Sequence, residues 1–196
     1  MGTYEIEIAA VKVKVTVIDS STLVDTYISE LKSLVQSGRR LVGLDIKTIN
    51  PGFFGLNSLL LLCVGTRCLV LQLQNLGCIP NSVRELLADA TICFVGTEMS
   101  DKFKQMPFRL TYFNRLRCES AVEIGHLAAR VLKNRSLEKC DLAELGNKVE
   151  MNFSMEFQGP VFPDWNALVL TIDEVKYLVY DVYRCYAIGN RLLGML

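Results

Sequence analysis

Residues 41–47 read LVGLDIK, an apolar run that stops at a carboxylate and an ammonium. A short apolar run of this kind is typical of a strand buried in the centre of a sheet. In open α/β sheets, ligands bind beyond the carboxyl ends of the strands, so Asp45 is the first candidate for chemistry. Because side chains alternate along a strand, Lys47 is expected on the same side as Asp45.

The chain on either side of this strand predicts a mixed sheet flanked by helices. Residues 4–18 alternate between apolar and polar side chains, which predicts a hairpin that turns near Ala9 and Ala10. Further strands are expected at residues 59–64, 68–73 and 91–95. Apolar spacing and capping residues predict helices at residues 23–35, 80–87, 100–106, 119–132, 141–149 and 171–193. This order favours the α/β class, and without linkers or repeats it favours one domain over residues 1–196.

The composition limits the classes of function. The 196 residues carry no net charge, because 21 basic side chains balance 21 acidic ones. Hydrophobic residues make up 51% of the chain, which excludes disorder as its general state. A neutral chain is a poor candidate for a purely electrostatic nucleic-acid binder, whose binding face is usually basic. Low net charge with high apolar content instead favours self-association, so a homo-oligomer is expected.

The cysteines and the start of the chain indicate a compartment. Seven cysteines, an odd number, lie mostly in apolar runs, and no secretory signal opens the sequence. This pattern predicts reduced thiols in an intracellular protein of the cytoplasm or nucleus. No apolar run approaches the ~18 uninterrupted residues that a membrane-spanning helix needs, so no membrane partner is expected.

A second candidate site lies on the last predicted helix. Tyr177 and Asp181 are four residues apart, which makes them neighbours on one helical face. The pair alone is weak evidence for a site, but the sequences of three other segments strengthen it. These segments are LLLLCVGTRCLVLQL at residues 59–73, FVGTEMSDKFKQM at residues 94–106 and DEVKYLVYDVYRCYAIGNRLL at residues 173–193, the last preceded by Asp164 and Trp165.

Together with the strand that carries Asp45, these segments resemble the 3′–5′ exonuclease domain of the ribonuclease D and Werner-type branch of the DEDD superfamily. The resemblance covers residues 41–193 and is greatest to the short, single-domain plant members, with residues 1–18 standing before it as a hairpin. It implies a ribonuclease-H-like α/β fold with a mixed sheet of five to six strands. It also implies four acids that hold two divalent metal ions, Mg²⁺ or Mn²⁺, and a tyrosine that orients the attacking water.

The family's motifs match this chain at three positions and depart from it at two. Asp45 falls on the first acid, and Asp181 and Tyr177 fall on the last acid and the tyrosine. The second acid of the first motif falls on Lys47, and the acid of the second motif falls on Lys102. The resemblance therefore implies a catalytic set of which only part is present.

Asp101 is the candidate for an acid that has shifted by one residue, because it directly precedes Lys102. A shift of one residue turns a side chain by ~100° about a helix axis, so local distortion would be required. If a metal ion binds, its ligands would be Asp45, Asp181 and Asp101.

The two lysines change the charge that the site offers to a metal ion. Four carboxylates balance two Mg²⁺ ions, whereas Asp45 and Asp181 balance Lys47 and Lys102 with no metal present. Unit charges ~4 Å apart interact by ~4 kcal/mol at an effective dielectric constant of ~20. We therefore expect no metal cofactor, and we expect salt bridges between the lysines and the acids.

Three hypotheses remain open. The first is an exonuclease-like protein with a degraded two-metal site that is catalytically impaired or inactive and binds nucleic acid or protein. The second is an active exonuclease that uses Mg²⁺ or Mn²⁺ on the ends of single-stranded RNA or DNA. The third is an oligomeric scaffold that does not touch nucleic acid.

Overall fold

A computed structural model of the chain describes residues 1–49, 57–104, 118–153, 165, 167 and 169–196. Asp164 and the last two residues of the helix predicted at 100–106 lie outside these described residues. Within the described ranges, no helix combines the length and apolar character that crossing a membrane requires.

The described residues form a central mixed sheet of seven strands, in the order β1-β2-β5-β4-β3-β6-β7. The predicted α/β class is confirmed, but the expectation of five to six strands is corrected to seven. Neighbours β1–β2, β3–β4 and β4–β5 are antiparallel, whereas β2–β5, β3–β6 and β6–β7 are parallel. The strands are β1 Gly2–Ile8, β2 Val11–Ile18, β3 Leu41–Ile49, β4 Asn57–Val64, β5 Arg67–Gln72, β6 Cys93–Gly96 and β7 Ala121–Glu123.

Strand β7 was not expected, because the sequence predicts one helix over residues 119–132. Ala121–Glu123 instead pairs in parallel with β6, and helix α5 begins only at Ile124. The apolar residues before Ile124 also fit a helical spacing, so the local pattern misses the switch. Pairing with β6 overrides this local preference, because it satisfies the backbone groups of both strands.

The N-terminal hairpin forms as predicted and turns at Ala9 and Ala10. Both residues have left-handed backbone angles, with φ of 49° and 63°. Two residues of positive φ are the turn that matches the twist of the flanking strands, although alanine is an uncommon choice there. The turn sets the register, in which Ile6 pairs with Val13 and both side chains are buried.

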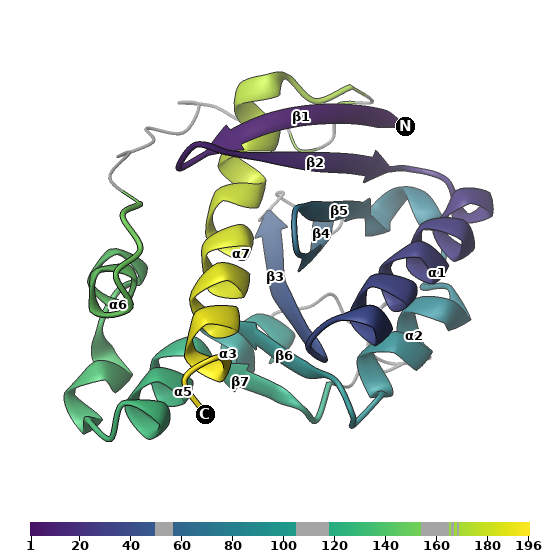
Figure 1. Ribbon diagram of the computed structural model, residues 1–196. Coiled ribbons are helices and arrows are strands. Elements are labelled where there is room, and N and C mark those ends of the chain that lie inside the picture. Colours follow the sequence, from purple (N-terminus) through teal and green to yellow (C-terminus); the bar gives the residue numbers. More distant parts are fainter. Residues whose placement is uncertain (50–56, 105–117, 154–164, 166, 168) are drawn as a thin grey trace.

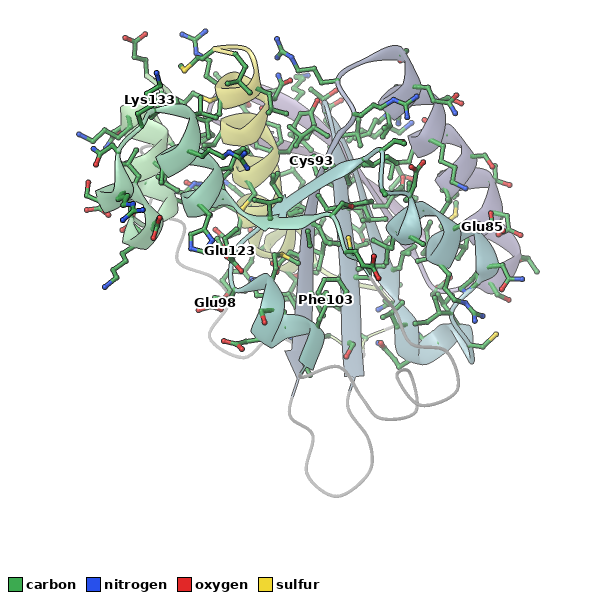
Figure 2. All side chains as sticks on the ribbon, turned by 90° about the horizontal axis from the view of Figure 1, so that it is seen from below. Glu85, Cys93, Glu98, Phe103, Glu123 and Lys133 are labelled. Carbon is green, nitrogen blue, oxygen red and sulfur yellow. The ribbon has the colours of Figure 1, made fainter. Side chains whose placement is uncertain are left out.

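Helices cover both faces of the sheet (Figure 1). Helices α1 and α2 pack on one face, whereas α5, α6 and α7 pack on the other. Figure 2, seen from below, separates the same layers, with Glu85 of α2 on one side and Lys133, just after α5, on the other. The helices are α1 Ser21–Ser37, α2 Asn81–Ala88, α3 Met99–Lys104, α5 Ile124–Val131, α6 Leu142–Lys148 and α7 Ile172–Leu193, with 3₁₀ turns η1 Leu73–Leu76 and η2 Arg135–Lys139.

Strand β3 divides its side chains between the two layers. Val42, Leu44 and Ile46 belong to the core on the side of α1 and α2. Leu41 belongs to the core under α7, and by the two-residue alternation Asp45 lies on that side too. Each buried aliphatic side chain stabilises the fold by ~1.5–3 kcal/mol, so the register of β3 is firmly set.

Gly43 allows helix α7 to lie directly on β3. A Cβ atom at this position would stand 2.5 Å from the Val182 carbonyl oxygen and 2.9 Å from the Tyr186 Cβ. The helix starts at a capping box in which Thr171 and Glu174 satisfy each other's backbone N–H groups. Close contact at Gly43 therefore brings the first turns of α7 over the end of β3.

Candidate functional site

A cleft of about 530 Å³ lies beyond the carboxyl end of β3. Strand β3, the segment that leads into α3, helix α7 and Trp165 all contribute side chains to it. Its described lining residues are Ile46, Lys47, Thr48, Thr97, Glu98, Asp101, Lys102, Trp165, Tyr177 and Asp181. Every residue that the sequence singled out, apart from Asp45, therefore lines one cleft, and Asp45 is bonded to two of them.

Asp45 lies at the base of this cleft and is only 3% exposed. Its Oδ1 accepts hydrogen bonds from Lys102 Nζ at 2.7 Å and from the Ile46 backbone N–H at 2.8 Å. Its Oδ2 forms an ion pair with Lys47 Nζ at 3.1 Å. Both oxygens of the buried carboxylate thus face ammonium groups of the same chain.

Asp181 is also held by two cations. Its Oδ2 lies 3.7 Å from Lys47 Nζ, and its Oδ1 lies 3.6 Å from Arg184 Nη1, one turn further along α7. The Arg184 guanidinium is buried against the rings of Phe153 and Tyr180, at 5.4 and 5.0 Å from their centroids. The sequence analysis did not single out Arg184, because its spacing from Asp181 is that of an ordinary surface pair.

Lys47 bridges the two acids and remains charged there. Burial opposes its charge, but the carboxylates of Asp45 and Asp181 outweigh burial and raise the pKa of Lys47 above its usual value. The raised pKa means that the ammonium form is more strongly held in the folded protein than in the unfolded chain.

Lys102 is positioned by a carboxylate that the sequence analysis missed. Glu123, at the end of β7, accepts hydrogen bonds from the backbone N–H groups of Glu98 at 2.8 Å and Met99 at 2.5 Å. Figure 2 shows the Glu123 side chain beside Glu98, where the chain enters α3. This contact holds the start of α3, and Lys102 then reaches Asp45 while also donating to Thr97 Oγ1 at 3.2 Å.

Asp101 lies in the same cleft but on a neighbouring side of α3. The residue of α3 that meets Asp45 is Lys102, and a step of one residue turns a helical side chain by ~100°. The structure therefore places the lysine, and not Asp101, against Asp45.

An aromatic wall closes another side of the cleft. The rings of Trp165 and Tyr177 are stacked, with centroids 5.9 Å apart and planes inclined by 15°. Lys47 Nζ lies 5.8 Å from the Tyr177 centroid, and Tyr177 remains 39% exposed. An exposed aromatic ring beside an ammonium can stack on a nucleobase while the ammonium contacts a phosphate.

The residues present do not fit a pair of divalent metal ions. Mg²⁺ and Mn²⁺ take oxygen ligands, and within the described ranges no group of three or more His, Cys, Asp or Glu side chains is placed to hold a metal. Three cations, Lys47, Lys102 and Arg184, instead face the two carboxylates of Asp45 and Asp181. This inner group is positive by one, but Glu98 and Asp101 also line the cleft, so the cleft as a whole has no surplus of positive charge.

Comparison with known proteins gives a distant but extended likeness. No family model matches the chain. A protein of Acanthamoeba polyphaga mimivirus, provisionally named as a 3′–5′ exonuclease, is 22% identical over 178 residues, which is 87% of this chain. The chain spans less than half of that relative, 43% of its length.

Solved structures of the EXD2 exonuclease domain share the fold. The domain soaked in Mn and Mg is 23% identical, with a TM-score of 0.53 over 92% of this chain and 89% of that one. The same domain soaked in Mn is 24% identical, with a TM-score of 0.53 over the same shares of the two chains. The sequence resemblance is therefore confirmed at the level of the fold, and this chain has the architecture of a 3′–5′ exonuclease domain.

Proposed function

We propose that this protein is a catalytically inactive relative of the 3′–5′ exonucleases, whose cleft binds single-stranded RNA or DNA without cleaving it. One observation carries this proposal. All four carboxylate oxygens of Asp45 and Asp181 lie within 3.7 Å of a cationic group of the same chain.

The energetics oppose a metal ion at this place. An ion between the two acids would have to displace Lys47 and Lys102, because each ammonium would repel a divalent ion at contact distance. Removing one partner of a buried ion pair typically costs ~3–5 kcal/mol, and here two such pairs converge on Asp45. The lysines thus neutralise Asp45 and Asp181, but they supply no activated water.

Binding of nucleic acid is supported by the exposed Tyr177 ring and by the Lys47 ammonium beside it, both in the lining of the cleft. An ammonium can bind a phosphate as a point charge, and aromatic side chains stack on bases without regard to sequence. The EXD2 exonuclease domain, which shares this fold, has been solved after soaking with GMP and with dGMP. We place the terminal nucleotide of a single strand in the cleft at the end of β3, with its phosphate toward Lys47 and Lys102.

The decisive experiment combines cleavage and binding. End-labelled single-stranded RNA and DNA are incubated with the protein and Mn²⁺, and binding is followed by fluorescence anisotropy at several salt concentrations. We expect no cleavage ladder, together with binding that weakens as salt rises. A ladder that disappears in the Asp45→Ala variant would establish an active exonuclease instead.

The active exonuclease is the second candidate, and the position of Asp101 in the cleft is the observation that favours it. In that case Asp101→Asn would abolish the ladder as completely as Asp45→Ala does. If neither cleavage nor binding is found and light scattering shows a stable oligomer, the hypothesis of an oligomeric scaffold is favoured.

A further inference from the structure

A second cleft, of about 480 Å³, opens at the other end of helix α7. Its lining includes Arg39, Met151, Tyr183, Tyr186, Asn190 and Arg191. We propose that this second cleft is a nucleotide-binding site in which Arg39 and Arg191 hold the phosphate, and Tyr186 with Met151 supports the base.

The second cleft is separate from the one at the end of β3. Helix α7 runs against the direction of β3, since Lys47 meets Asp181 near one end and Leu41 lies by Gly189 near the other. Figure 1 shows α7 alongside β3, with the end of the chain at the far end of the helix. From Asp181 to Arg191 the helix advances by ~15 Å at ~1.5 Å per residue, which separates the charged groups of the two clefts.

Arg39 is fixed in place while part of its guanidinium remains available. Its Nη1 donates to the Asn190 carbonyl at 2.8 Å and to the Asn190 side-chain oxygen at 2.9 Å. Gly194 leaves room for the group, because a Cβ atom there would lie 3.0 Å from Arg39 Nη2. Within the described ranges no carboxylate pairs with Arg39, and a guanidinium held by one nitrogen presents its remaining N–H donors as a fork.

Arg191 adds a second guanidinium to the same cleft. Its Nη2 lies 3.7 Å from Glu150, but the side chains are 54% and 85% exposed, so water screens this ion pair. None of the described residues that line the second cleft is acidic. Arg39 has no carboxylate partner among the described residues and Arg191 has only the exposed Glu150, so both guanidinium groups can offer N–H donors to phosphate oxygens.

The rest of the lining suits a nucleobase. Tyr186 is a half-buried residue of α7 in the lining, and Met151 adds a flexible apolar side chain, whereas the neighbouring Tyr183 is buried in the core. Base–aromatic stacking and sulfur–aromatic contacts do not depend on which base is present. The volume lies within the range of ~300–1,000 Å³ that small-molecule sites occupy.

The test uses the full chain and isothermal titration calorimetry with AMP, adenosine and inorganic phosphate as separate probes. We expect AMP to bind, with adenosine and phosphate each at least ~10-fold weaker, since each lacks one half of the contacts. Failure of AMP to bind at millimolar concentration would overturn the proposal. Equal affinity for AMP and adenosine would do the same, because the arginines would then contribute nothing.

Variants locate the bound AMP. The variants Arg191→Gln and Arg39→Lys should each lower the affinity for AMP at least ~10-fold. Arg39→Lys keeps a cation near the Asn190 carbonyl but removes the guanidinium fork. The matched control is Arg130→Gln, which changes an exposed arginine on α5 and should leave the affinity unchanged. AMP binding that survives both arginine variants but is lost in Tyr177→Ala would place the nucleotide in the β3 cleft and overturn this proposal. The proposals for the two clefts can therefore be confirmed or refuted independently.

Discussion

The two clefts at the ends of α7 have similar volumes, about 530 and 480 Å³, but opposite electrostatic organisation. At the carboxyl end of β3, lysines are held against buried and half-buried carboxylates, so most of their charge is already compensated. At the far end, Arg39 is held by the uncharged Asn190 and Arg191 pairs only with the exposed Glu150, so less of their charge is compensated. A cation's role therefore depends on its partners, and a positive side chain alone does not indicate a phosphate site.

The largest effect should come from removing the charge at the centre of the first cleft. Asp45→Asn leaves the ammonium groups of Lys47 and Lys102 without their common carboxylate. We expect a loss of ~3–5 kcal/mol in the free energy of unfolding, measured with urea, because Lys102 then loses its carboxylate and Lys47 keeps only its longer pair with Asp181. Glu7→Gln, on an exposed part of β1, is the control and should cost under ~0.5 kcal/mol. If both variants lost the same free energy of unfolding, Asp45 would not be compensating the charge of the two lysines.

Restoring the family's acids should convert the first cleft into a metal site. In the double variant Lys47→Glu with Lys102→Asp, four carboxylates replace the compensated ion pairs. At Mn²⁺ concentrations ~100-fold above Kd, binding stabilises by ~2.7 kcal/mol, which raises Tm by roughly 5–10 °C in a chain of this size.

The wild-type protein should show no such rise in Tm, and neither should the control Lys139→Glu with Lys148→Asp, whose lysines are exposed outside the cleft. A wild-type Tm that climbs with Mn²⁺ as steeply as that of the double variant would show that the lysines do not exclude the metal. The proposed inactivity would then be wrong.

A smaller effect is expected from the aromatic wall of the first cleft. Tyr177→Ala removes an exposed ring that stacks on Trp165 and lies beside Lys47. Loss of one base-stacking contact should weaken the binding of single-stranded RNA by ~1–3 kcal/mol, measured by fluorescence anisotropy. The control is Tyr27→Ala, on the opposite side of the sheet. If Tyr177→Ala leaves the affinity for RNA unchanged, no base stacks on Tyr177 in this cleft.

The smallest effect concerns pH. Because the folded protein raises the pKa of Lys47, its stabilisation is complete below the ordinary value of 10.5 and is lost as pH rises through the higher folded value. Tm should therefore fall above pH 10.5 more steeply in the wild type than in Lys47→Met, which has no proton to lose. Parallel curves for the two proteins would show that Lys47 is not held by the acids.

Much of the first cleft could be predicted from the sequence, because it depends on spacing. A period of two places Lys47 on the side of Asp45, and a spacing of four places Tyr177 beside Asp181. The role of Glu123 could not be predicted, since it caps the entry to α3 from a strand that the local pattern reads as part of a helix. Arg184 was missed for a related reason, because its burial against Phe153 depends on a residue far away in the chain.

Periodicity along the chain was enough to identify the α/β class and the buried strand with Asp45, since each depends on neighbours a few residues away. The resemblance to the exonuclease family, and not periodicity, identified Lys47 and Lys102 as lysines at acid positions. The seventh strand, the closure of the cluster around Asp45 and the arginine cleft depend on contacts between distant segments. Arg39 and Asn190, for example, are 151 residues apart yet share hydrogen bonds. Such pairs are set by how α7 packs on β3, through the contact at Gly43, and no local spacing encodes that packing.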